Sequence, residues 1–278
     1  MRIAICYSGL GSRLNRYIHL VENQLSTLST CDTDLFFSCW ADGPSQEELT
    51  NSVKLLIARL NSKNIRLVKL EVVGQSYPPI KSNYNNLWSK GNSVSAINGM
   101  FTSMKNADKL RQQEEKENNF KYDIVIKSRP DISIDGPVDL SSIKEILTSE
   151  AMVVVPKGWN WFNHWHGTGG MLNDQLFFST PDLMTLITDV DIDKCCEEGS
   201  RFHPESIMWW RVAKQVPIPD HLKDKEIPWY RFMLFDMDLQ NKGKEMFNPA
   251  HIFPQENIEK FKLDKILESI NVKPNIQN

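Results

Sequence analysis

The chain has 278 residues, of which 41% are apolar and 24% are charged, as is typical of a globular protein. Its formal net charge of −3 argues against a nucleic-acid-binding protein, which would carry a surplus of basic residues. No stretch approaches the roughly 18 consecutive apolar residues of a transmembrane helix, so no transmembrane segment is predicted.

The cysteine content and the N-terminal sequence indicate in which cellular compartment the protein is expected. The five cysteines include no CxxC pair: Cys6, Cys31, Cys39, Cys195 and Cys196. An odd number of cysteines without metal-ligand spacing indicates reduced thiols, so a cytoplasmic location is expected. The N-terminal apolar run is too short for a signal peptide and is interpreted as a strand.

A strand at Arg2–Tyr7, a glycine-containing turn and an amphipathic helix over residues 12–28 are predicted first. This order presents the free backbone amides of a helix N-terminus to an anion. Ser8, Gly9 and Arg13 are therefore candidate ligands of a diphosphate. The alternatives are a glycine that serves only the turn and an Arg13 exposed to solvent. The turn matches neither the dinucleotide-binding nor the P-loop pattern.

The next segments predict a parallel sheet. Strands are expected at Asp34–Trp40 and Ile65–Val73, with a helix at Gln46–Leu60 between them. This βαβαβ order favours a parallel sheet with helices on both faces. A long helix is predicted at Leu87–Gln113.

A buried strand is predicted at Tyr122–Ser128, followed directly by Arg129, Pro130 and Asp131. Proline cannot donate to a sheet, so pairing should end there, at the edge where α/β proteins bind ligands. Arg129 and Asp131 would face the same way. An arginine guanidinium can bind the oxygens of a phosphate, and an aspartate carboxylate can bind Mg²⁺ or Mn²⁺. The alternative is an ion pair that only closes the strand end.

The distal half is predicted to continue the alternation. A helix is expected at Asp139–Leu147, a strand at Ala151–Val155 and a helix at Pro181–Val190. From Pro217 onwards the proline-rich and aromatic sequence predicts an irregular tail, with a final helix near Ile258–Ile270.

The segment Gly158–Gly170 is rich in tryptophan, histidine and glycine. Aromatic rings beside imidazole and amide groups suit the face and rim of a sugar. Trp161, His164 and His166 are therefore candidates for sugar or acceptor binding. The two histidines could instead form a metal-binding pair or be structural histidines.

Asn173, Asp174 and Gln175 lie just before an apolar run. Amide and carboxylate groups at such a junction indicate ligand contacts, and the alternative for Asp174 is a cap on the following turn. Asp174 is the candidate catalytic carboxylate, while Asn173 and Gln175 would bind the acceptor. Glu205, at the start of a helix predicted at Phe202–Val212, is expected to interact with the positive end of that helix.

Several of these segments together resemble bacterial and viral glycosyltransferases of GT-A fold. They are Ile3–Arg13 followed by DLFFSCW, Tyr122–Asp131, Asn173-Asp174-Gln175 with a helix at Pro181–Leu186, and Pro204-Glu205. The resemblance implies a Rossmann-like α/β fold with a mixed, mainly parallel sheet. It covers residues 1–215, expected to form the nucleotide-sugar-binding and catalytic domain, with 216–278 as a C-terminal extension packed on it.

The resemblance also implies a nucleotide-sugar donor and a Mn²⁺ or Mg²⁺ ion held by a DxD motif. Here the motif differs, because Ser133 stands where the second aspartate would be and Asp135 lies further on. Asp131 would keep the metal role. Arg129 would bind the diphosphate together with the first turn.

The expected function is therefore transfer of a sugar from a nucleotide-diphosphate donor to a glycan or other hydroxyl acceptor, as in a hexosyltransferase. One alternative is a non-catalytic carbohydrate-binding protein, which the serine at position 133 would favour. Another is a sugar nucleotidyltransferase, which would consume a nucleoside triphosphate and release pyrophosphate.

Overall fold

The structure is a computed structural model. It describes residues 1–76, 80, 94–135, 138–149, 151–156, 172–217, 219–220, 232–240 and 250–252. For residue 135 and for the ranges 232–240 and 250–252, the description is limited to the backbone.

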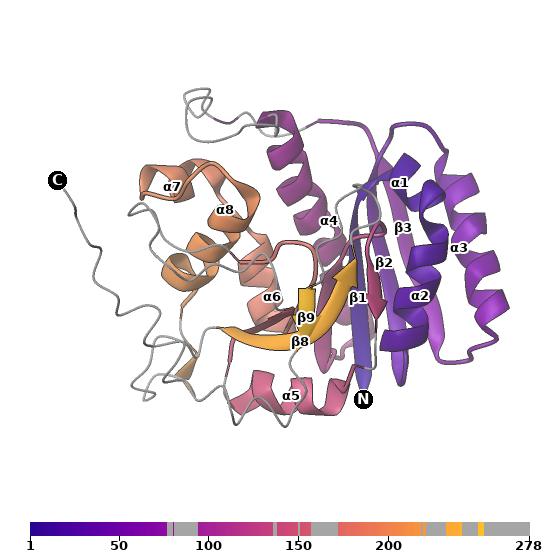
Figure 1. Cartoon of the computed structure of the whole chain (residues 1–278). Coiled ribbons are helices and arrows are strands. Elements are labelled where there is room, and N and C mark those ends of the chain that lie inside the picture. The colour runs from indigo at the N-terminus through magenta and orange to yellow at the C-terminus, as the bar shows by residue number, and fades with distance from the viewer. Residues whose placement is uncertain are drawn as a thin grey trace.

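A mixed sheet forms the centre of the molecule (Figure 1). Its strands are β1 (Arg2–Leu10), β2 (Asp32–Trp40), β3 (Ile65–Val73), β4 (Ile124–Ser128), β5 (Ser133–Asp135), β6 (Val153–Pro156), β7 (Phe177–Ser179), β8 (Phe232–Gln240) and β9 (Ala250–Ile252). Within the described ranges, these nine strands follow the order β3-β2-β1-β4-β7-β6-β8-β5, with β9 paired to β8. Only β5, β7 and β9 run opposite to the others. The predicted mixed, mainly parallel α/β fold is confirmed.

Helices cover both faces of the sheet, as Figure 1 shows. One face packs against α1 (Gly11–Arg16), α2 (Ile18–Leu28), α3 (Gln46–Leu60) and α5 (Leu140–Ser149). The other packs against α4 (Val94–Asn118), α6 (Pro181–Thr188), α7 (Ile192–Glu197) and α8 (Pro204–Trp210), after which Arg211–Gln215 forms a π-helical turn. In the part of the chain that the structure covers, no helix combines the length and apolar character needed to cross a membrane.

The central strand β1 shows why the sequence folds this way. Ile3 and Ile5 pack into the core on the α2–α3 side, whereas Ala4 and Cys6 pack into the core on the α4 side. Successive side chains of a strand point to opposite faces, so a strand covered on both faces is apolar throughout. The apolar run that predicted this strand therefore reflects burial on both faces.

Two boundaries near the N-terminus differ from those predicted. The segment from Ser8 to Leu10, predicted as a turn, continues β1, because its pairing with β2 extends as far as Leu10 and Trp40. Gly9 adopts φ +147°, which only glycine adopts readily. The single helix expected over residues 12–28 is broken at Tyr17 (φ −111°, ψ 23°) into α1 and α2.

The region after Pro217, predicted to be irregular, contributes β8 and β9. β8 pairs parallel with β6 and antiparallel with β5, so its partners lie far away in the sequence. Strands that are stabilised by distant partners show little evidence of strand structure in their local sequence. The predicted helix at Ile258–Ile270 lies outside the described residues, and the boundary between residues 215 and 216 stays a prediction.

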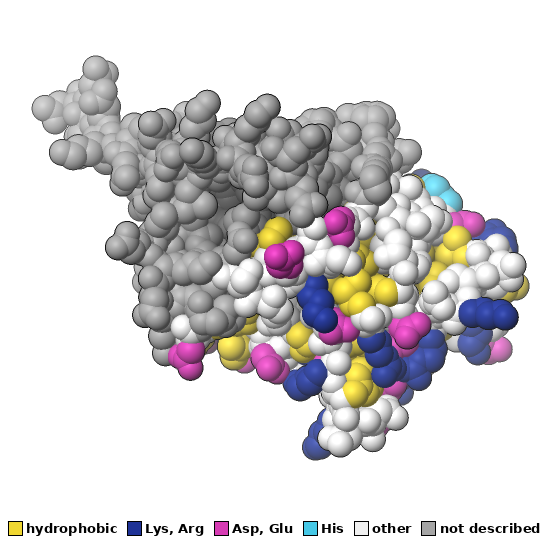
Figure 2. All heavy atoms as spheres, turned by 90° about the horizontal axis from the view of Figure 1, so that it is seen from below, with side chains coloured by type: hydrophobic (Ala, Val, Ile, Leu, Met, Phe, Trp, Pro, Cys, Tyr) yellow, Lys and Arg dark blue, Asp and Glu magenta, His cyan; other side chains and the backbone are white. Residues whose placement is uncertain are grey.

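The end of the sheet where the parallel strands begin is closed by ion pairs. Asp34 accepts hydrogen bonds from Arg2, Arg66 and the Tyr122 hydroxyl. Figure 2 shows this end of the molecule, where Lys and Arg side chains alternate with Asp and Glu. Paired charges of this kind indicate a structural surface.

Candidate functional site

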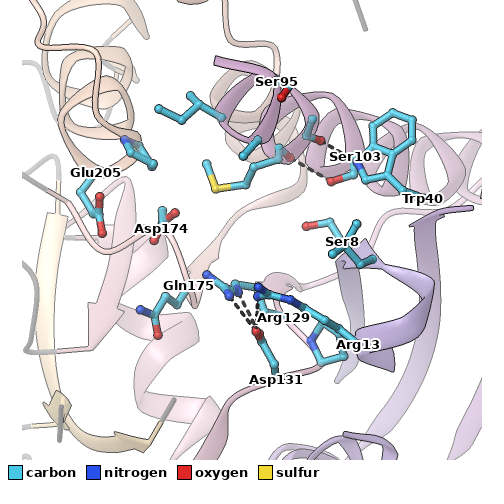
Figure 3. Close-up of a pocket in the computed structure, with 18 residues that line it drawn as sticks. Ser8, Arg13, Trp40, Ser95, Ser103, Arg129, Asp131, Asp174, Gln175 and Glu205 are labelled. Carbon is cyan, nitrogen blue, oxygen red and sulfur yellow. Dashed lines mark hydrogen bonds and ion pairs between the residues drawn. The ribbon is translucent and has the colours of Figure 1, made fainter. Parts of the chain in front are cut away.

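A pocket of about 440 Å³ opens at the other end, where β1 and β4 finish (Figure 3). Tyr7 lies opposite Ser128 in these adjacent parallel strands, so the residues that follow them reach the same edge of the sheet. The placement of the first strand's end beside Arg129–Asp131, predicted from the sequence, is confirmed. The lining comes from β1, α1, β2, α4, the segment after β4, the turn before β7 and the start of α8.

A buried glutamine fixes the bend after β4. Gln24 of α2 donates to the carbonyl oxygens of Arg129 (2.9 Å) and Ile132 (2.8 Å), and it accepts from the Ser128 hydroxyl (2.6 Å). Pro130 ends the strand pairing, so buried carbonyls in the bend need other donors. Gln24 supplies them and thereby fixes the direction in which the Arg-Pro-Asp segment leaves the sheet.

Two guanidinium groups converge on Asp131. Arg129 donates from Nε to Oδ1 (2.9 Å) and from Nη2 to Oδ2 (2.7 Å), and Arg13 donates from Nη1 to Oδ2 (2.6 Å). Burial alone would raise the pKa of Asp131, but the two guanidinium groups outweigh it and hold the pKa at about 2. Arg13 is thus half-buried and ion-paired, which differs from the solvent-exposed alternative.

The donor set at Asp131 does not fit a divalent cation. Both oxygens of this fully buried carboxylate already accept from arginine, and a metal ion there would lie beside two positive charges. Among the residues that the structure describes, no three His, Cys, Asp or Glu side chains are grouped to hold a metal ion. The side chain of Asp135 lies outside the description.

The N-terminus of α1 already holds a carboxylate. The Ser12 amide donates to Asp42 Oδ1 (2.7 Å), and the Ser12 hydroxyl donates to the other carboxylate oxygen. This amide is therefore not offered to a diphosphate, contrary to the expectation for the first strand–helix connection. Ser8 and Gly9 do line the pocket, and their predicted contact with the donor stays a prediction.

Asn173, Asp174 and Gln175 form a tight turn before β7. The Asn173 side-chain oxygen accepts from the backbone amides of Gln175 (2.8 Å) and Leu176 (3.4 Å). Asp174 and Gln175 line the pocket. Asn173 thus binds the two amides that follow Asp174 in this turn, and the next element is the strand β7.

A buried lysine, which the sequence interpretation did not single out, supports this turn. Lys127 of β4 donates from Nζ to the backbone carbonyl of Asp174 and, at 3.4 Å, to that of Gln175. Burial lowers the pKa of Lys127 to about 8. A lysine inside an otherwise apolar strand was the available signal, because such a side chain is rarely buried without partners.

A second carboxylate enters the pocket from α8. Glu205 lies in the first turn of this helix, and its Oε2 is 2.7 Å from Nδ1 of His203. Burial alone would lower the pKa of His203, but Glu205 outweighs it and raises the pKa. Figure 3 shows Asp174 and Glu205 on one side of the pocket and Ser8, Arg13 and Trp40 on the other. The sequence assigned Glu205 only to the helix end.

The remaining wall of the pocket comes from α4, and the sequence did not predict that this helix borders the site. Trp40 donates from its ring nitrogen to the Gly99 carbonyl (3.0 Å), which holds β2 against α4. Ser95, Met100 and Ser103 of this helix complete the wall. The lining residues Ser95, Gly99 and Ser103 are four residues apart and so mark one helical face, but this spacing does not indicate which face borders a pocket.

Trp161, His164 and His166 lie outside the described residues, so their roles in sugar binding stay predictions. Of the other predicted site residues, Ser8, Gly9, Arg13, Arg129, Asp131, Asp174 and Gln175 all line one pocket. Asn173 is fully buried and holds the turn behind that pocket.

Comparison with known proteins gives a likeness in fold. No protein-family model matches the sequence, and no curated protein matches it. Among solved structures, the chain is similar to mouse xyloside xylosyltransferase 1 in its apo form, with a TM-score of 0.43 and 9% sequence identity. The likeness covers 84% of each chain.

Proposed function

We propose that the protein is a glycosyltransferase that moves a sugar from a nucleoside-diphosphate donor to a hydroxyl acceptor. The observation that carries this proposal is one pocket with two guanidinium groups and two further carboxylates, those of Asp174 and Glu205. Transfer from a diphosphate needs positive charge beside the leaving group. It also needs a group that takes or orients the acceptor proton. The pocket offers both kinds of group.

Arg13 and Arg129 would bind the diphosphate. Within the described part of the chain, Arg129 uses two of its N–H groups and Arg13 uses one to hold Asp131. A guanidinium carries five N–H donors, so donors remain for phosphate oxygens. The planar fork matches an anionic oxygen pair better than an ammonium does.

Asp174 would receive the proton of the acceptor hydroxyl. Its backbone is held by Lys127 and by the turn around Asn173, so its carboxylate is attached to a rigid support. Gln175 would bind an acceptor hydroxyl through its amide. Glu205, whose carboxylate lies against the His203 ring, would orient the acceptor.

A donor screen tests the proposal. UDP- and GDP-sugars are expected to raise the Tm of the purified protein, and an acceptor glycan is expected to release the nucleoside diphosphate. Binding of glycans without any donor turnover would instead identify a carbohydrate-binding protein. Release of pyrophosphate from a nucleoside triphosphate and a sugar phosphate would identify a nucleotidyltransferase.

A further inference from the structure

We propose that Arg13 and Arg129 neutralise the diphosphate directly, without a divalent cation on Asp131, and that Asp131 serves to position the two guanidinium groups. The anion site is inferred from the pocket itself. Its assignment to a nucleotide sugar rests on the proposed function.

The three side chains differ in how far they are exposed to the pocket. The Asp131 side chain is 1% exposed, whereas those of Arg129 and Arg13 are 15% and 37% exposed. Solvent, and therefore a ligand, reaches the two cations far more than the carboxylate. A metal-binding carboxylate must instead turn an oxygen towards the ion and the phosphate that share it.

The charge of this group also favours an anion over a metal ion. Arg13, Arg129 and Asp131 together carry one net positive charge, apart from the carboxylates of Asp174 and Glu205 elsewhere in the pocket, and an anion can share that charge without a metal ion. A divalent cation would add two positive charges at hydrogen-bonding distance from both arginines. Repulsion would then oppose the metal ion at the point where the resemblance to metal-dependent enzymes would place it.

Asp131 itself has a structural role between the two arginines. Arg13 comes from α1 and Arg129 from the end of β4, and like charges from separate elements would repel each other. The shared carboxylate holds them side by side, and Gln24 fixes the bend that carries Asp131. Asp131 is thus a positioning residue.

Calorimetric titration with UDP, GDP and inorganic pyrophosphate, each in EDTA and in Mg²⁺, tests the proposal. For the wild-type protein we expect affinities in EDTA and in Mg²⁺ to agree within about twofold. Arg13→Met should weaken binding roughly 10- to 100-fold in both buffers, the range for one charge-assisted hydrogen bond. Arg13→Lys, which keeps the charge, should lose less.

Arg16→Met is the matched control, because Arg16 is an exposed arginine of the same helix that does not line the pocket. Its affinities should equal those of the wild type. Asp131→Asn should weaken binding in EDTA as much as in Mg²⁺, whereas a metal ligand would lose only the Mg²⁺-dependent part.

Binding that requires Mg²⁺ would overturn the metal-free site and leave the glycosyltransferase proposal standing. Pyrophosphate binding in EDTA without turnover of any nucleotide sugar would support the anion site and contradict the glycosyltransferase proposal. Binding of none of the three probes in either buffer would overturn both.

Discussion

The ammonium of Lys127 donates a hydrogen bond to the backbone carbonyl of Asp174, the residue whose side chain lines the pocket. The lysine belongs to β4, the strand next to β1 in the sheet, and its side chain is buried. It therefore joins a buried strand inside the sheet to the turn that carries the candidate base. Strand-borne support of this kind holds a functional group more precisely than a loop alone.

Lys127 gives the first prediction. Burial lowers its pKa from 10.5 to about 8, so between these pH values the unfolded chain binds more protons than the folded one. The unfolding free energy of the wild type should therefore rise between pH 8 and pH 10.5, relative to Lys127→Met, by on the order of 3 kcal/mol. Urea unfolding of both proteins across this range measures the difference, and parallel curves would contradict the assignment.

Asp174→Asn should lower the transfer rate by about 10²–10⁴-fold, the usual contribution of general base catalysis. The substitution keeps the shape of the side chain but removes its basicity, so donor affinity should change little. Steady-state kinetics with the best donor from the screen would measure the effect. Asp182→Asn is the control, because Asp182 is an exposed aspartate of α6. A variant with a lower Tm but unchanged turnover per folded molecule would show that Asp174 is structural.

Gln24→Leu should lower the unfolding free energy by about 1–3 kcal/mol, because the buried carbonyl oxygens of Arg129 and Ile132 would lose their donor. It should also weaken diphosphate binding, since the bend that carries Asp131 would no longer be fixed. Chemical denaturation and UDP titration report the two effects. Gln113→Leu, at an exposed position of α4, should change neither quantity. A stable Gln24→Leu protein with normal affinity would refute the role of this glutamine.

The lowered pKa of Asp131 predicts that the unfolding free energy falls in acid. The folded pKa of about 2 lies below the ordinary 3.8, so the stabilisation is fully present above pH 3.8 and is lost as the pH falls towards 2. About 2 kcal/mol of unfolding free energy should disappear in this window, at about 1.4 kcal/mol per pKa unit. Asp131→Asn should be less stable at pH 7 and should lack this part of the acid dependence. Equal acid dependence in the two proteins would count against the ion pairs.

The sequence predicted the parts of the site that depend on local pattern. The buried run of β4 ended by Pro130, and the strand–helix alternation, together place Arg129 and Ser8 at one edge. The contacts that define the chemistry are not local. Arg13 meets Asp131 across 118 positions, and an acidic residue after Pro204 looks the same in sequence whether it faces solvent or a pocket. Tertiary packing decides between those cases.

The same limit applies to the fold. A continuous apolar run reveals strands covered on both faces, such as β1, because every residue carries the signal. The short β5 and β7 and the late β8 depend on their partners for stability, and their sequences show little period of their own. Asp42 at the start of α1 could not be predicted either, because it comes from the segment after β2.

The position of β8 has a consequence for biosynthesis. The parallel strands β1–β4 can pair while the chain is still on the ribosome, but β5 and the second edge of β6 both wait for β8, which is translated much later. Until then the edge of β6 that β8 will cover presents unpaired backbone groups, which can pair with a neighbouring nascent chain. Long-range closure of this kind also slows folding. The nascent chain is therefore expected to need chaperones until β8 is made, and chains truncated before β8 are expected to aggregate.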